Sequence, residues 1–330
     1  MRAFQYVKPT DMAEAVTLLT RESEATVLAG GTNLVDLMKL GVMRPGTLVD
    51  VTGLGMDAIE HRPDGSTFVG ATVRNGDLAG DEGIRERFPV LSEAILAGAS
   101  GQLRGAATTG GNLLQRTRCV YFQDITKPCN KREPGSGCSA AEGVHRDLAV
   151  IGTSSNCYAS HPSDMAVALA ALDAKIVVRR AGGEEVALGI DDFYRLPGDT
   201  PERENVLEPG ELITGVEIPA APAGAVMRYR KVRDRASYAF AVVSVAAIIA
   251  TDADGAVDNV RVALGGIGSR PWRAHHLERA LLGRHLDPAL LQQAGHEEFA
   301  NATPLPQNAF KVGLGIDVIS MLLRDLAGSL

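Results

Sequence analysis

The sequence has no excess of basic residues and no long apolar run. Of 330 residues, 33 are Lys or Arg and 40 are Asp or Glu, which gives a formal net charge of −7. This balance argues against a nucleic-acid binder that relies on a broad basic surface. The longest nearly apolar run, residues 239–250, is too short for a bilayer span, which needs roughly 20 residues. The N-terminal segment has no basic part followed by an apolar part, so we expect no signal peptide.

The sequence also lacks the patterns of several enzyme classes. No Ser/His/Asp arrangement and no pair of carboxylates stands out, and the seven His are scattered, so a hydrolase is disfavoured. There is no GxGxxG fingerprint after a predicted strand, which disfavours the Rossmann mode of dinucleotide binding. The basic stretch at residues 228–235 could contact a cofactor or a partner. For most of its residues, however, we predict a solvated strand edge.

A chain of 330 residues has room for two domains, because domains usually have about 100–200 residues. The segment PAAPAG at residues 219–224 has the composition of a linker. We therefore predict one domain over residues 1–221 and another over residues 222–330. The first domain carries an irregular insertion at about residues 115–160, and loops of that length are usually functional.

Hydrophobic periodicity predicts a mixture of helices and strands. Helices are expected at residues 12–19, 34–40, 84–97 (split at Pro89), 164–172, 271–282 and 308–326. Strands are expected at residues 25–28, 47–51, 67–73 and 175–179, with a hairpin of residues 240–251 and 257–264 around Asp254 and Gly255.

Two short motifs combine paired glycines with hydroxyl and amide side chains. The first lies between a predicted strand and a predicted helix and consists of Leu28, Ala29, Gly30, Gly31, Thr32, Asn33 and Leu34. The second consists of Thr108, Thr109, Gly110, Gly111 and Asn112, within a predicted turn at residues 105–112. Glycines let a backbone approach an anion closely, and a following helix offers free N–H groups. Two such turns suggest that two loops grip a diphosphate, although plain tight turns remain the alternative.

The four cysteines all fall in the predicted insertion. Cys119, Cys129, Cys138 and Cys157 are spaced C-x9-C-x8-C-x18-C. Four thiolates can bind one zinc ion or a [4Fe–4S] cluster, and this spacing is diagnostic of neither. Two disulfides or unrelated free thiols are the alternatives. The loop between Cys129 and Cys138 has no apolar anchor, so we favour a metal site, with His161 either a substitute ligand or a nearby residue.

Taken together, LAGGTNL, TTGGN, HPSDMAVAL and YRKV resemble the FAD-binding subunits of the xanthine dehydrogenase family of molybdenum hydroxylases. The segment CNKREPGSGC is similar to the FAD and iron–sulfur subunits of bacterial periplasmic aldehyde oxidoreductases. The resemblance implies an α+β fold. Its first part is an FAD-binding domain of the PCMH type, like that of vanillyl-alcohol oxidase, built from two α/β subdomains. Its second part is an α+β domain like the C-terminal domain of the carbon monoxide dehydrogenase flavoprotein.

The resemblance also assigns residues. It implies that the two glycine motifs hold the FAD diphosphate and that the four cysteines ligate a [4Fe–4S] cluster. Asp164, Ile213 and Lys231 match positions that contact the cofactor in the family. An aromatic residue that touches the flavin in the animal enzymes falls at Gly98 here, which leaves the electron acceptor, NAD included, open.

The implied function is electron transfer within a heterotrimer or larger complex that oxidises aldehydes. Its partners would be a large molybdenum-cofactor subunit and a small subunit with two [2Fe–2S] clusters, with electrons leaving from FAD to an external acceptor. A partner that carries an export signal would take the folded chain to the periplasm, and the cytoplasm is the alternative. Two rival hypotheses are a zinc-stapled scaffold without a redox role and a stand-alone flavin oxidase.

Overall fold

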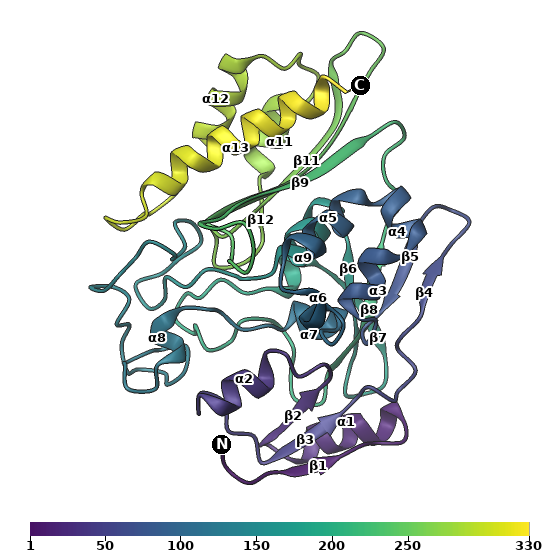
Figure 1. The fold of residues 1–330 in the computed structure, drawn as a ribbon, viewed down its shortest axis with the longest axis vertical. Helices are drawn as coiled ribbons and strands as arrows, with labels where there is room; N and C mark the ends of the chain where they lie inside the picture. The colour runs from purple at the N-terminus through teal and green to yellow at the C-terminus, as the bar shows by residue number, and fades with distance from the viewer. Residues whose placement is uncertain (330) are drawn as a thin grey trace.

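The computed structural model describes residues 1–329. Three sheets follow one another along the long axis, from the N-terminal end of the molecule to the C-terminal end (Figure 1).

Three short parallel strands form the first sheet, in the order β1-β3-β2: β1 (Gln5–Val7), β2 (Ala25–Leu28) and β3 (Thr47–Asp50). Helix α1 (Met12–Arg21) covers it, and the carboxylate of Asp11 accepts a hydrogen bond from the Glu14 N–H at 2.8 Å at the start of this helix. Helix α2 (Leu34–Lys39) follows β2. The predicted order of elements in this segment is confirmed.

The second sheet is antiparallel, in the order β4-β5-β8-β6-β7: β4 (Ile59–His61), β5 (Thr67–Gly70), β6 (Lys175–Arg179), β7 (Glu185–Gly189) and β8 (Leu212–Ile218). The helices of this part of the chain are α3 (Asn75–Gly80), α4 (Glu82–Arg87), α5 (Pro89–Ala97), α6 (Gly101–Arg104), α7 (Thr109–Leu113), α9 (Asp164–Ala171) and α10 (Ile190–Phe193). The predicted split at Pro89 is confirmed, because this residue begins α5.

Helix α9 lies at the centre of the molecule. Every residue from Met165 to Ala171 is buried, as expected for a helix that is apolar all round. It packs against α5 on one side and against the C-terminal sheet on the other. Its first residue, Asp164, is therefore held at the junction of the two halves.

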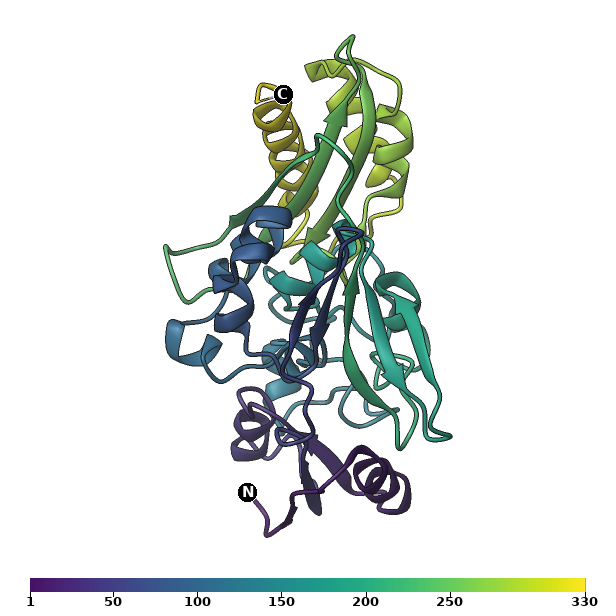
Figure 2. The same ribbon diagram turned by 90° about the vertical axis from the view of Figure 1, so that its right-hand side faces the viewer.

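The C-terminal sheet is antiparallel, in the order β12-β11-β10-β9: β9 (Val226–Val232), β10 (Val243–Thr251), β11 (Val257–Gly265) and β12 (Trp272–Arg273). Three helices cover its outer face: α11 (His275–Leu281), α12 (Pro288–Glu298) and α13 (Phe310–Ala327) (Figure 2).

Strand β10 explains the longest apolar run of the sequence. Val245, Ala247 and Ile249 belong to the core under the C-terminal helices. The alternate residues Ala246 and Ile248 belong to the core of the first two sheets. A strand buried on both faces needs apolar residues at every position. Among residues 1–329, no helix is long and apolar enough to cross a bilayer.

The insertion between α7 and α9 contains little regular structure apart from α8 (Val120–Gln123). Its two isolated antiparallel bridges join Cys129 to Cys138 and Ser154 to Cys157. In Figure 1 the insertion lies beside α2 and reaches up to the C-terminal part. The predicted loss of periodicity in this segment is confirmed.

The structure corrects some expectations. The predicted elements do not include strands β1, β4, β7, β8 and β12 or helices α3, α6, α8, α10 and α12. The helix expected at residues 271–282 begins only at His275, after the short strand β12. The second glycine motif is not an open turn, because Thr109 already begins α7.

Candidate functional site

The first glycine turn follows β2 and leads into α2. A Cβ atom at Gly30 would lie 1.9 Å from the carbonyl oxygen of Ala106, so only glycine fits there. Gly31 has a φ of 69°, a left-handed conformation that glycine adopts without strain. Residues 28–34 all remain partly exposed. One side of this turn thus packs against Ala106, just before the second glycine motif, and the turn remains partly exposed to solvent.

The second glycine motif is anchored to the segment that follows β5. The backbone N–H of Thr109 donates to the carbonyl oxygen of Val73 at 2.9 Å, and that of Gly110 donates to Ala71 at 2.8 Å. The Thr109 hydroxyl also donates to Val73. Thr109 and Gly110 are buried, and their hydrogen bonds join this motif to the segment after β5. Thr108 caps α7, and Asn112 accepts a hydrogen bond from the Ser163 hydroxyl at 2.6 Å.

Three buried polar atoms around these loops have no partner in the described structure: Asn33 Nδ2, Thr72 Oγ1 and Asn75 Oδ1. The Asn75 N–H donates to Ala107, next to the residue that Gly30 touches. A buried polar atom without a partner costs about 1–3 kcal/mol. Three of them around one junction indicate a polar ligand. Sequence reasoning missed Thr72 and Asn75, because no glycine pair or charge marks their segment.

Asp164, at the start of α9, forms a buried ion pair with β9. Lys231 Nζ lies 2.8 Å from Asp164 Oδ2, and the two side chains are 4% and 10% exposed. The Tyr229 hydroxyl donates to Asp164 Oδ1 at 2.5 Å. Burial, reinforced by the Asp164 carboxylate, raises the pKa of Tyr229 well above its usual range. Lys231 also donates to the Ala97 carbonyl oxygen at 3.2 Å.

The basic stretch therefore has two faces. The side chains of Arg228 and Arg230 are 64% and 49% exposed on the edge strand β9. Only Tyr229 and Lys231 turn inward to Asp164. The expectation of a solvated strand edge for most of the stretch is confirmed.

Gly98 lies beside Asp164, and Ile213 lies in the main core. A Cβ atom at Gly98 would be 3.1 Å from Asp164 Oδ2, which confines side chains at this position. Ile213 is 5% exposed and belongs to the main core. Its neighbour Thr214 accepts the N–H of Ala71 at 2.9 Å, so Ile213 supports the segment that carries Thr72.

A cavity of about 400 Å³ extends from Asp164 toward the insertion. Its lining comes from the start of α9, from the β9–β10 loop with Phe240, and from the insertion with Arg118 and Cys119. Pockets of this size commonly hold small organic ligands. Cys119 also lines a second, smaller cavity.

All four cysteines line that smaller cavity, together with residues such as Phe122, Lys131 and Ala159. They are free thiols. Burial raises the pKa of Cys119 to about 11 and raises that of Cys157, and neighbouring thiols act in the same direction in both cases. Within residues 1–329, no group of three or more His, Cys, Asp or Glu side chains converges closely enough to hold a single ion. The thiols instead surround a shared space.

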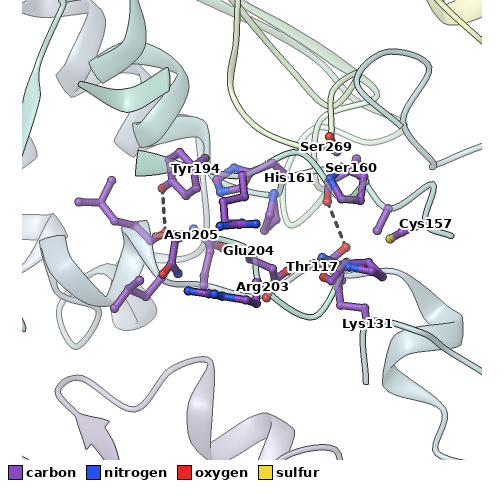
Figure 3. Close-up of a pocket in the computed structure, with 18 residues that line it drawn as sticks. Thr117, Lys131, Cys157, Ser160, His161, Tyr194, Arg203, Glu204, Asn205 and Ser269 are labelled. Atoms are coloured by element: carbon purple, nitrogen blue, oxygen red, sulfur yellow. Dashed lines mark hydrogen bonds and ion pairs between the residues drawn. The ribbon is translucent and has the colours of Figure 1, made fainter. Parts of the chain in front are cut away.

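A further pocket near Cys157 is lined by charged residues that the sequence did not single out, among them Lys131 and Glu204 (Figure 3). Glu204 binds Arg116 at 2.6 Å and Lys131 at 3.1 Å. Burial alone would raise the pKa of Glu204, and the two cations outweigh it and hold this pKa below its usual value. Isolated charges far apart in sequence carry no spacing signal that could have revealed this group.

His161 lines both the 400 Å³ cavity and the pocket of Figure 3. Its Nδ1 accepts the Ser163 N–H at 3.3 Å, and its Nε2 is buried without a partner. Burial lowers the pKa of His161 to about 4, so the ring is neutral near pH 7. It does not line the cavity that the four cysteines share, so the alternative of a nearby residue fits better than a substitute ligand.

Comparisons with known proteins agree with this arrangement. Residues 2–221 match the family described as the FAD binding domain in molybdopterin dehydrogenase. Residues 228–310 match the C-terminal domain of the CO dehydrogenase flavoprotein. The fold also matches a carbon monoxide dehydrogenase structure from Hydrogenophaga pseudoflava, with a TM-score of 0.76 and 23% identity over 99% of this chain and 98% of that one. This likeness confirms the predicted fold class.

Among curated relatives, the aldehyde oxidoreductase FAD-binding subunit PaoB of Escherichia coli is 51% identical over 98% of both chains. The carbon monoxide dehydrogenase medium chain of Afipia carboxidovorans is 27% identical over 88% of this chain and 84% of its own. The chain therefore belongs to the FAD-binding medium subunits of the molybdenum hydroxylase family.

Proposed function

We propose that this chain is the electron-transfer flavoprotein subunit of a molybdenum-containing complex that oxidises aldehydes. The observation that carries the proposal is the meeting of two glycine motifs around Asn33, Thr72 and Asn75, each with a buried polar atom that lacks a partner. FAD binding is common to the matched family. The aldehyde substrate rests on the printed name of the E. coli relative.

Most of the proposed FAD contacts lie in the two glycine motifs. The backbone around Gly30 and Gly31 is accessible and would bind the diphosphate, with the Asn33 amide as a donor. The proposed contacts are Leu28, Ala29, Gly30, Gly31, Thr32, Asn33, Leu34, Thr108, Thr109, Gly110, Gly111, Asn112, Asp164, Ile213 and Lys231. Bound FAD supplies the redox chemistry, while the chain binds it, orients it and excludes water.

We propose that Cys119, Cys129, Cys138 and Cys157 ligate a [4Fe–4S] cluster. The support is that four free thiols line one cavity. Each iron of a cubane takes one thiolate, which suits sulfurs arranged around a space. The ligands of one zinc ion would converge to about 2.3 Å from a common centre.

The relatives are named as subunits or medium chains of larger enzymes. We propose a large molybdenum-cofactor subunit and a small subunit with two [2Fe–2S] clusters as partners here. The chain would receive electrons from the small subunit and deliver them to an external acceptor. We further propose a domain boundary between residues 221 and 222, and a periplasmic location reached with a signal-bearing partner.

The test is a visible spectrum of the purified complex before and after dithionite, together with counts of FAD, iron and acid-labile sulfide per copy of this chain. We expect one FAD and about four iron and four sulfide on the cubane hypothesis. A chain that carries zinc and no flavin would contradict the proposal. If the isolated chain oxidised aldehydes by itself, the stand-alone oxidase would replace it.

A glycine variant tests the FAD site directly. Gly30→Val places a side chain against the Ala106 carbonyl oxygen, so we expect FAD to be lost while iron is retained. Gly80→Ala is the matched control, because a Cβ there meets nothing within 4 Å. Retention of FAD in Gly30→Val would contradict the proposed diphosphate site.

A further inference from the structure

We propose that Lys131 tunes the reduction potential of the cysteine-bound cluster and that Glu204 limits its effect. This inference rests on the [4Fe–4S] cluster proposed above. It assigns a role to a partly buried charged group made of Arg116, Lys131 and Glu204, whose side chains are 22%, 9% and 26% exposed.

Lys131 is the only charged side chain among the described residues that line the cysteine cavity. It follows Cys129 by two positions and lines the cavity that all four cysteines share. Its side chain is only 9% exposed, so its charge is largely shielded from solvent. A charge held at this place acts on the cavity with little solvent screening.

The structure fixes Lys131 firmly. Its Nζ donates to the Pro201 carbonyl oxygen at 2.8 Å and lies 3.1 Å from Glu204 Oε1. Arg116 holds the other side of Glu204 at 2.6 Å and stacks over Phe122 at 4.6 Å. With two cations and one carboxylate, the group of Arg116, Lys131 and Glu204 has one net positive charge. A surplus of this kind is costly in a protein interior unless a negative group lies nearby.

A cubane bound by four thiolates is that negative group. One-electron reduction would make the iron–sulfur cluster more negative by one unit. No bond in the chain forms or breaks, and the electron comes from the partner subunit or from dithionite. A nearby cation stabilises the reduced state more than the oxidised one, so it raises the potential. Glu204 neutralises part of that charge and lowers the potential again. The two side chains therefore have opposite effects.

The experiment is a potentiometric titration of the full complex, with the cluster followed by electron paramagnetic resonance and FAD by absorbance. We expect Lys131→Met to shift the cluster midpoint to more negative values and Glu204→Gln to shift it to more positive values, while the FAD midpoint stays unchanged. Lys131→Arg keeps the positive charge, so the midpoint potential of its cluster should equal that of wild type. Lys127→Met is the control, because it removes an exposed cation two positions before Cys129 and should cause a much smaller shift.

The outcomes separate the two proposals. Wild-type protein without iron would overturn the cluster itself. Iron at wild-type levels with unshifted midpoints, or equal shifts for Lys127→Met and Lys131→Met, would overturn only the tuning role. Loss of iron from every Lys131 and Glu204 variant would show that these residues hold the fold, which also overturns tuning.

Discussion

The side-chain oxygen of Asn33 accepts a hydrogen bond from the backbone N–H of Arg116 at 2.9 Å. This bond joins the first glycine turn to the start of the cysteine insertion, 83 positions along the chain. It also orients the Asn33 amide, whose nitrogen is left without a partner. The FAD turn and the cysteine loop are thus parts of one assembly.

Helix α2 is the second connection between them. Leu37 is fully buried against Phe122 and Cys129. Leu37→Ala should lower the free energy of unfolding by about 2–5 kcal/mol. It should also lower both the FAD and the iron content. Leu40→Ala, at a position 43% exposed, should change neither. The measurement is FAD and iron per chain, with the FAD dissociation constant from titration. Loss of only one of the two groups would contradict the coupling.

The buried pair of Asp164 and Lys231 gives a second prediction. Lys231→Met removes the cation 2.8 Å from a carboxylate that is 10% exposed. Breaking a buried pair in this way costs about 3–5 kcal/mol, and we expect weaker FAD binding as well. Arg228→Met removes an ion pair whose arginine is 64% exposed and should cost less than about 1 kcal/mol. Urea unfolding and FAD titration measure both. Equal effects of the two variants would rule out a special role for Lys231.

Because Lys311 is buried, we predict that the free energy of unfolding depends on pH. Lys311 is fully buried and donates to Leu148 and Gly266, and burial lowers its pKa from 10.5 to about 8. Between these values the unfolded chain binds more protons, so the free energy of unfolding rises with pH. The rise is about 3 kcal/mol from pH 8 to 10.5. Asp147, Asp234 and Arg146 are the charges that act on Lys311.

The comparison is urea unfolding of wild type and Lys311→Met at several pH values. The difference in free energy between the two proteins should change by that amount, whereas Lys39→Met, at an exposed position, should follow wild type throughout. A constant difference between wild type and Lys311→Met would contradict the assignment.

The cysteines give a fourth prediction. On the cubane hypothesis, Cys138→Ser should reduce iron from about four per chain to near zero. It should also remove the part of the visible absorbance that dithionite bleaches and that FAD does not account for. Ser155→Ala, at an exposed position of the same insertion, should retain both. Chemical iron analysis and the visible spectrum provide the test, and a Cys138→Ser protein with full iron would exclude this ligand.

Local patterns predicted the parts of the fold that depend on neighbouring residues. The α1 helix and the turn after β2 are examples, because each signal lies within a few positions. Strand β8 was missed because Thr214 and Gly215 interrupt its apolar pattern. Gly215 is required by tertiary packing, since a Cβ there would lie 2.3 Å from the Phe68 ring.

The same division holds for the candidate site. Glycine pairs and clustered cysteines are visible as short motifs. Thr72 and Asn75 carry no such mark, and the pairing of Arg116 with Glu204 joins positions 88 residues apart. Helix α12 could have been found, because Asp287 caps it and Pro288 occupies its first turn.

Strand β10 has a consequence for how the chain unfolds. Its alternate residues serve two cores, so neither half of the molecule has a complete interior without the other. A fragment of residues 222–330 would expose Ala246 and Ile248, both fully buried in the whole chain, along one face of a sheet. Such a face promotes self-association in water. We therefore expect the two halves to unfold together in one cooperative transition and neither half to be stable alone.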